Sequence, residues 1–270
     1  MGCYQPLDQR VSCIMTFPAT FHDLSGKSVF ITGGGSGIGA SLTDGFLGQG
    51  ANVTFVQRSD ATEFCDQMES KHGNRPLFIQ CDITDTTALR SAFTQAVAKY
   101  GDIEVLVNNA ANDKRHTVEE VTEEFWEWMH AINLKAYFFA IQAVIPAMKA
   151  SRNGAIINLS SISYMMGNAG YPLYTTANAG LNGMTRSLAR DLGAFNIRVN
   201  ALAPGWVLTQ KQLDLWADPN SLAAHLERQC LKEHLEPADI VGGVLFLASN
   251  VSRMMTGQTI VVDGGVVVTG

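Results

Sequence analysis

The chain has 270 residues, of which 46% are apolar and 16% charged, and its formal net charge is −6. Such a composition is globular and far from that of disordered chains. The acidic balance argues against nucleic acid and against an anionic membrane surface as partners, because both attract basic surfaces. The five cysteines show no CxxC spacing. They indicate neither a disulfide framework nor a zinc site, and a reducing cytoplasmic setting fits them.

The first fourteen residues lack a continuous apolar stretch and a cleavage site, so they do not look like a signal peptide. We expect residues 1–14 to be a disordered extension that precedes a single nucleotide-binding domain over 15–270, which also carries the active site. Met15 is a second candidate for the start of the protein. No run of 18 apolar residues occurs, which argues against a membrane span.

Strand-like and helix-like segments alternate along the rest of the chain. Strands are predicted at 28–32, 51–56, 77–80, 104–107, 154–159, 198–202 and 259–262, and helices at 38–49, 61–72, 85–100, 123–150 and 174–193. Thr84 is the expected N-cap of the third helix, and Pro204 to about Ser221 is predicted to be a long irregular loop. The alternation predicts an α/β fold with one Rossmann-type, doubly wound parallel sheet of about seven strands and helices on both faces.

A glycine-rich segment, Thr32-Gly-Gly-Gly-Ser-Gly-Ile-Gly39, lies between the first strand and the first helix. Glycines at this place allow a tight turn and let the main chain approach a pyrophosphate, which the helix N-terminus stabilises. The loop has no Gly-Lys-Ser/Thr and is therefore not a P-loop. The position of the loop favours a dinucleotide site over a connector without a ligand.

Further motifs follow the later strands at regular intervals. They are Asn108-Asn-Ala-Ala111, Asn133, Ser161, Tyr174 thirteen residues later, Pro204-Gly205 and Val262-Asp-Gly-Gly265. Together they resemble the short-chain dehydrogenase/reductase family over about residues 24–265. The stretches Asn112-Asp-Lys-Arg-His116 and Gln229-Cys-Leu-Lys232 are similar to those of bacterial aldose 1-dehydrogenases of this family, which oxidise sugars such as D-xylose.

The resemblance implies a role for each matching residue. Ser161 hydrogen-bonds the substrate oxygen, Tyr174 is the general acid and base, Asn133 holds a water in a proton relay, and Asp82 contacts adenine. Hydride transfer from an alcohol needs such a base and a second group that fixes the oxygen. The expected cofactor-binding residues are Gly33, Ser36, Gly37, Ile38, Gly39, Gln57, Arg58, Asp82, Ile83, Asn109, Ala110, Tyr174, Asn178, Pro204, Gly205 and Val207. The expected substrate-facing residues are Asn112, Arg115, Ser161, Tyr164, Asn168 and Trp206.

The end of the second strand bears on the choice of cofactor. An acidic residue at this position binds the ribose of NAD, but this chain has Gln57 followed by Arg58. An arginine can bind a 2′-phosphate through its planar fork, and Ser36 can add a hydroxyl. NADP is therefore expected to be preferred over NAD, with stacking of Arg58 on adenine as the alternative.

One position departs from the family pattern. The motif Tyr-x-x-x-Lys is here Tyr174-Thr-Thr-Ala-Asn178, so the catalytic set is Asn133, Ser161, Tyr174 and Asn178. In the family the lysine binds the nicotinamide ribose and lowers the tyrosine pKa. Asparagine can hydrogen-bond but carries no charge. We expect an oxidoreductase of a sugar with impaired turnover, and the alternative is a dinucleotide-binding sensor or scaffold.

The remaining features predict no second site. The histidines lack metal-ligand spacing, no metal is expected, and the absence of GxSxG excludes a nucleophile-elbow serine hydrolase. The long apolar helices at 123–150 and 174–193 and the apolar tail 266–270 predict a homotetramer, because the helices pair across a two-fold axis in the family that the chain resembles.

Overall fold

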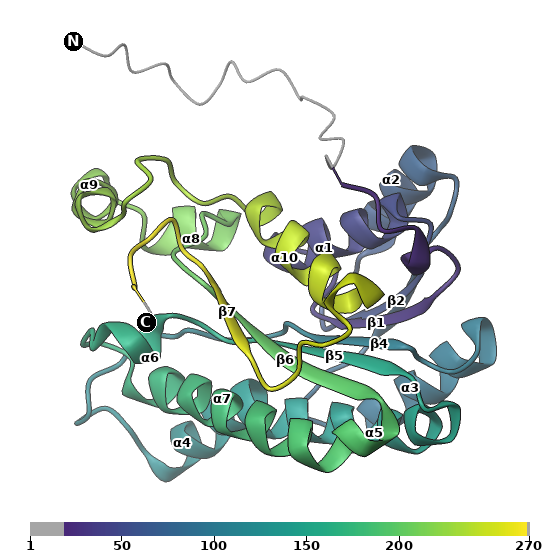
Figure 1. The fold of residues 1–270 in the computed structure, drawn as a ribbon. Helices are drawn as coiled ribbons and strands as arrows, with labels where there is room; N and C mark the ends of the chain where they lie inside the picture. Colours follow the sequence, from purple (N-terminus) through teal and green to yellow (C-terminus); the bar gives the residue numbers. More distant parts are fainter. Residues whose placement is uncertain (1–18, 269–270) are drawn as a thin grey trace.

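The computed structural model describes residues 19–268, so the expected extension at 1–14 lies outside the described residues (Figure 1). Its centre is a sheet with strand order β3-β2-β1-β4-β5-β6-β7, and every neighbouring pair is parallel. The strands are β1 Ser28–Thr32, β2 Asn52–Gln57, β3 Leu77–Gln80, β4 Val105–Asn108, β5 Gly154–Leu159, β6 Ile197–Pro204 and β7 Thr259–Val262. The seven-stranded doubly wound sheet confirms the predicted fold class.

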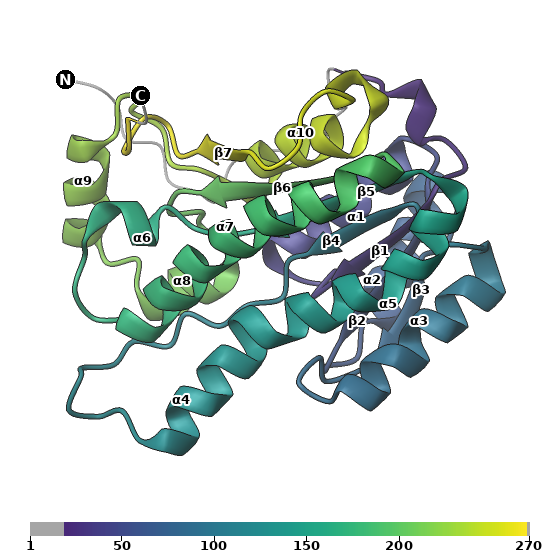
Figure 2. The same cartoon turned by 60° about the horizontal axis from the view of Figure 1, so that its bottom comes forward.

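Helices cover both faces of the sheet (Figures 1 and 2). One face carries α1 Gly37–Gly48, α2 Thr62–His72 and α10 Pro237–Ala248, and the other carries α3 Thr86–Tyr100, α4 Glu123–His130, α5 Ala136–Ser151 and α7 Pro172–Leu192. Short 3-10 turns occur at His22–Leu24, Gly193–Phe195 and Asn250–Ser252. The central strands are buried along their length because a parallel sheet is covered on both sides.

The helix predicted at 123–150 is interrupted. A π-helical segment, Ala131–Lys135, separates α4 from α5. The side-chain nitrogen of Asn133 donates to the carbonyl of Met129 at 2.9 Å, the acceptor that an α-helix would pair with the main-chain N–H of Asn133. The predicted helical stretch is therefore confirmed, but its middle turn is π-helical and places Asn133 toward the loop after β4.

The loop predicted from Pro204 to about Ser221 was also wrong, because it contains α8 Gln210–Leu215 and the start of α9 Pro219–Arg228. Thr209 caps α8, and Asp218 caps α9 with Pro219 in the first turn. The sequence also gave no prediction for the four-residue helix α6 Ser163–Met166 or for α10. Of these helices, α6, α8 and α9 contribute residues to the cavity at the carboxyl ends of the strands, whereas α10 packs on a face of the sheet.

One stretch of the described residues, Glu123–Ser151, is long and apolar enough to cross a membrane by length and composition alone. Its second half, α5, packs on the sheet, where Tyr137, Ala140 and Ile141 are buried. Burial of this kind is the pattern of a core helix in an α/β fold.

Candidate active site

A cavity of about 1150 Å³ lies at the carboxyl ends of the strands. The loops after β1 and β4 leave toward helices on opposite faces, and such a switch point is where doubly wound sheets bind ligands. The predicted residues that line it are Gly33, Ser36, Gly37, Ile38, Gly39, Gln57, Arg58, Asp82, Ile83, Asn109, Ala110, Asn112, Arg115, Ser161, Asn168, Tyr174, Pro204, Gly205, Trp206 and Val207. The structure thus brings most of the predicted residues together in one cavity.

Three of the predicted site residues are not among those that line this cavity: Asn133, Tyr164 and Asn178. The amide of Asn133 is fully engaged by the main chain, since it accepts from the N–H of Asn112 at 2.8 Å and donates to the carbonyls of Asn112 and Met129. A side chain so occupied positions the loop after β4. Its part in holding a water remains a prediction.

The glycine loop has the shape that a pyrophosphate requires. Gly33 has φ +71° and Gly37 φ +52°, a region that side chains rarely adopt. A Cβ on Gly39 would overlap the carbonyl of Gly33. The side chain of Asn109 donates to the carbonyls of Thr32 and Gly33 at 3.0 and 3.1 Å and fixes the loop against β4. The N-terminus of α1 then faces the cavity, so these residues fit the phosphates of a dinucleotide.

The far end of the cavity offers a cation without a partner. Gln57 is engaged, because it accepts from the N–H of Gly35 at 3.0 Å and donates to Ser59. The exposed guanidinium of Arg58 and the hydroxyl of Ser36 have no hydrogen bond or ion pair among the described residues. Both groups therefore remain available to an anion at this end.

Asp82 and Ile83 lie beside this end of the cavity, after β3. One oxygen of Asp82, Oδ1, accepts from the N–H and the hydroxyl of Thr84 at 2.9 and 2.7 Å. The bonds orient the carboxylate, whose other oxygen remains an acceptor. Ile83 is buried and supplies an apolar wall.

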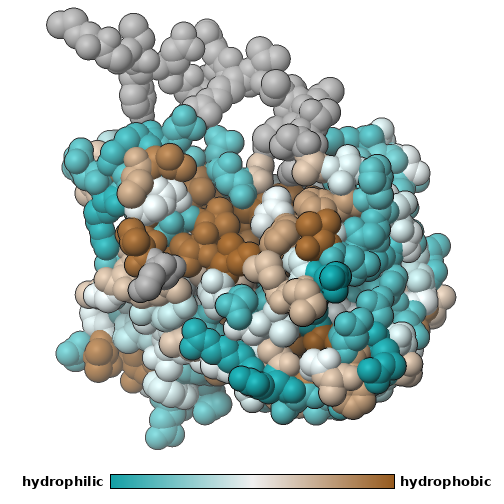
Figure 3. Space-filling model, viewed as in Figure 1, coloured by the Kyte–Doolittle hydropathy of each residue, from teal (hydrophilic) through white to brown (hydrophobic). Residues whose placement is uncertain are grey.

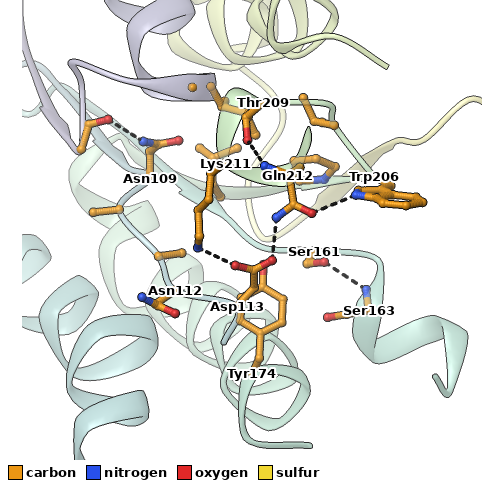
Figure 4. A pocket seen from close by; sticks show the side chains of 18 of the residues that line it. Asn109, Asn112, Asp113, Ser161, Ser163, Tyr174, Trp206, Thr209, Lys211 and Gln212 are labelled. Carbon is orange, nitrogen blue, oxygen red and sulfur yellow. Dashed lines mark hydrogen bonds and ion pairs between the residues drawn. The ribbon is translucent and has the colours of Figure 1, made fainter. Parts of the chain in front are cut away.

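Ser161 and Tyr174 meet at the other end (Figure 4). Ser161 follows β5, and its Oγ accepts from the N–H of Ser163 at 3.1 Å, which leaves its hydrogen free to donate. Tyr174 lies in the first turn of α7. Burial, followed by the negative charge of Asp113, raises the pKa of Tyr174 to about 12, while the side chains of Ser161 and Asn178 act in the opposite direction. Tyr174 is therefore protonated near neutral pH.

Asn178 is buried one turn beyond Tyr174 on α7. Its side-chain nitrogen donates to the main-chain carbonyl of Tyr174 at 2.9 Å. The main-chain carbonyl of Asn178 accepts from the hydroxyl of Ser160 at 3.3 Å and from the side-chain amide of Asn182 at 2.7 Å. The residue thus stabilises α7 and supplies no charge to Tyr174.

On the substrate side, Arg115 stacks on aromatic rings. Its guanidinium lies 3.9 Å from the ring centre of Tyr171 and 5.4 Å from that of Trp216. Asn168 approaches Arg228 on α9 at 3.4 Å, and the indole N–H of Trp206 donates to Gln212 at 2.8 Å. Aromatic faces and polar groups therefore alternate around this end of the cavity.

Several lining residues were missed at the level of sequence, above all Asp113, Lys211 and Gln212. Asp113 forms an ion pair with Lys211 at 2.6 Å and accepts from the amide of Gln212 at 2.7 Å. The partners are 98 and 99 residues away along the chain. Only the position of Asp113, in the loop after β4, signalled a site residue. The described residues hold no cluster of three or more His, Cys, Asp or Glu able to bind a metal ion.

The fold and this cavity define a Rossmann-type oxidoreductase. A family model described as enoyl-(acyl carrier protein) reductase matches residues 33–267. The chain is 47% identical over 255 residues to the probable galactose dehydrogenase GalD of Rhizobium meliloti, across 93% of this chain and 100% of that protein. The chain belongs to the short-chain dehydrogenase/reductase family, whose members use NAD or NADP.

Two further relatives agree with this assignment. The D-xylose 1-dehydrogenase of Caulobacter vibrioides is 42% identical over 250 residues, across 92% of this chain and 98% of that protein. A blue fluorescent protein from a metagenomic library, solved in complex with NADPH, is 36% identical and superimposes with a TM-score of 0.83, across 91% of this chain and all of that one. The predicted family resemblance is therefore confirmed.

Proposed function

We propose that the protein oxidises an aldose at its anomeric carbon to a lactone, with NADP as the preferred cofactor. The observation that carries this proposal is the single cavity that joins Ser161 and Tyr174 to the glycine loop. Two relatives named as sugar dehydrogenases support the substrate class. The alternating aromatic and polar lining around Arg115 and Trp206 suits a polyhydroxylated ring of pentose or 6-deoxyhexose size.

When bound, NADP supplies the acceptor for a hydride from the substrate carbon. The glycine loop would hold the pyrophosphate, and Pro204, Gly205 and Val207, which line the same cavity, would flank the nicotinamide. Ser161 donates a hydrogen bond to the substrate oxygen, and Tyr174 in its ionised form takes the proton of the substrate hydroxyl. Because the pKa of Tyr174 is raised to about 12, little of the tyrosine is ionised at neutral pH, and turnover that needs the ionised form should rise with pH.

The preference for NADP rests on Arg58 and Ser36. Neither group has a partner among the described residues, and both line the cavity. Because β2 ends in Gln57 and not in a carboxylate, no charge at this position repels a 2′-phosphate.

A second candidate function is a dinucleotide-binding sensor or scaffold. The specific observation in its favour is that Asn178 cannot supply the charge that would lower the pKa of Tyr174. The intact pair of Ser161 and Tyr174 favours the enzyme, because a binding module does not require it.

Turnover assays separate these functions. The purified protein is mixed with D-xylose, D-galactose or a 6-deoxyhexose and with NAD or NADP from pH 7 to pH 10, with Tyr174→Phe and Ser161→Ala as matched controls. We expect cofactor reduction with an aldose and its loss in both variants. Cofactor binding without turnover of any alcohol would favour the sensor, and turnover of a steroid or an acyl thioester in place of aldoses would overturn the substrate class.

A further inference from the structure

Asp113 occupies a fixed place at the substrate end of the cavity. The residue before it, Asn112, is clamped by Asn133, which binds both its N–H at 2.8 Å and its carbonyl at 3.0 Å. The side chain of Asp113 is only 18% exposed. Figure 4 shows its carboxylate next to Tyr174 and on the same side of the cavity as Ser161.

The carboxylate has acceptor capacity to spare. Its Oδ1 accepts from the Nζ of Lys211 at 2.6 Å and its Oδ2 from the Nε2 of Gln212 at 2.7 Å, both residues of α8. An ionised carboxylate offers about four lone-pair positions, so roughly two remain for a ligand. Gln212 is held in turn by the indole N–H of Trp206 at 2.8 Å. Lys211 and Gln212 therefore fix the orientation of the Asp113 carboxylate before a substrate binds.

The charge at this place is unfavourable for the reaction itself. After burial, Asp113 is the next cause of the raised pKa of Tyr174. The other ionisable groups near Tyr174 are Tyr171, Tyr137 of α5, Lys211 beyond Asp113, and Arg115, which stacks on Tyr171. Asp113 therefore does not assist the ionisation of Tyr174. Its carboxylate can instead accept hydrogen bonds from hydroxyl groups, and hydrogen bonds to an ionised group are strong.

We propose that Asp113 is the hydroxyl-binding carboxylate of the substrate cavity, held by Lys211 and Gln212, and that it selects neutral polyhydroxylated substrates. It accepts hydrogen bonds from hydroxyl groups next to the oxidised carbon. A sugar acid or a sugar phosphate with its anionic group at this place is repelled, and an apolar alcohol leaves the carboxylate without donors. This inference rests on the proposed function and adds the residue that sets substrate choice.

Two variants test this role of Asp113, and we expect them to shift the pH–rate profile in opposite directions. Asp113→Asn removes a negative charge near Tyr174, so the pH–rate profile moves to lower pH, and it weakens hydroxyl binding, so KM for the sugar rises about 10- to 100-fold. Lys211→Met leaves the carboxylate without its cation, so the profile moves to higher pH. Asp214→Asn on α8 is the matched control and leaves both quantities unchanged, because Asp214 is not among the residues that line the cavity and its carboxylate accepts only from Gln210 among the side chains of α8. If Asp113 only fastened α8, Lys211→Met, which also breaks the contact to α8, would raise KM for the sugar as much as Asp113→Asn does, and this result would overturn the proposal.

Monodeoxy sugars identify the hydroxyl that Asp113 binds. The unmodified protein discriminates against at least one monodeoxy analogue about tenfold or more in kcat/KM, and Asp113→Asn loses that discrimination. Equal discrimination by both proteins against every analogue contradicts the inference while the aldose dehydrogenase remains. If the unmodified protein oxidises no aldose but does oxidise another alcohol, the proposed function has failed instead.

Discussion

Asn178, at the position where the family has lysine, affects how readily the hydroxyl of Tyr174 loses its proton. A tyrosine of pKa about 12 is ionised in roughly one molecule in 10⁵ at pH 7. Turnover that needs the phenolate therefore rises with pH. For a tyrosine at its ordinary pKa of about 10, this rise would extend to about pH 9–10. Burial and Asp113 extend this rise to higher pH, and the positive charge of an oxidised nicotinamide opposes the shift only in part.

We predict that Asn178→Lys raises turnover at pH 7 by about 10- to 10³-fold, because a cation within roughly 4–6 Å lowers the pKa of a neighbouring acid by about 1–3 units. Affinity for the cofactor stays nearly the same, since the glycine loop is unchanged. The measurement is a pH–rate profile with one aldose, and Asn178→Met is the control of similar length without charge. Coincident profiles for the lysine variant and the unmodified protein would show that another group activates Tyr174.

The second prediction concerns Arg58 and the affinity of the protein for NADP. Removal of a charged hydrogen bond costs about 1.5–3 kcal/mol, so Arg58→Ala weakens NADP binding by about 10- to 100-fold. NAD binding changes little and serves as the internal control. Ser36→Ala has the smaller effect of a neutral hydrogen bond. Titration calorimetry measures both cofactors, and a preference for NAD in the unmodified protein would refute the role of Arg58.

The sequence located the site residues whose positions follow from strand ends. The glycine loop, Ser161 and Tyr174 each follow a strand or begin a helix, so their meeting was predictable from a parallel sheet. The ion pair between Asp113 and Lys211 was not predicted from the sequence, because it depends on how α8 packs over the cavity. Tyr164 lies outside the cavity lining because the segment after β5 forms the short helix α6, which turns Ser163 and Met166 toward the cavity in its place.

At the scale of elements, strands were easier to predict than helix boundaries. The strands at 28–32 and 154–159, which are buried on both faces, read as short apolar runs and agree with the structure, and so do the partly buried edge strands at 77–80 and 259–262. The helices failed where side chains compete with the main chain. Asn133 interrupts one helix, and Asp218 with Pro219 begins another where we expected a loop. Hydrogen bonds from side chains to the main chain determine the helices at these places, and the periodicity of apolar residues gives no information about such hydrogen bonds.

The N-cap of α3 gives a prediction at this scale. We expected Thr84, but Asp85 caps the helix, accepting from the N–H groups of Thr87 and Ala88 at 2.9 and 3.0 Å. Asp85→Ala therefore lowers the free energy of unfolding by about 1 kcal/mol, whereas Asp85→Asn, which keeps a capping oxygen, changes it by much less. Denaturant titration measures both variants. Equal losses in the two would mean that the charge of Asp85 matters more than its hydrogen bonds.

At the scale of the whole molecule, two surfaces stay apolar at the edges of the fold. On α4 and α5, Trp126 and Phe138 are each 44% exposed. The strand β7 ends the sheet with a free edge whose residues are only partly buried, and Val268 beyond it is 88% exposed. Figure 3 shows apolar side chains gathered on the face that carries β7. Exposed apolar edge strands and apolar helix faces are typical of surfaces that contact another protein chain.

We therefore predict a homotetramer with two kinds of two-fold contact, one through the helices α4, α5 and α7 and one through β7 and the tail after it. Light scattering at micromolar concentration should give four times the 29.2 kDa of the chain. Phe138→Asp places a charge in the helical contact and should give smaller species, because the desolvation of an unpaired carboxylate opposes association. Val97→Asp is the matched control, since Val97 is 39% exposed on α3, away from both contacts. A monomer mass for the unmodified protein, or equal dissociation of both variants, would contradict this assembly.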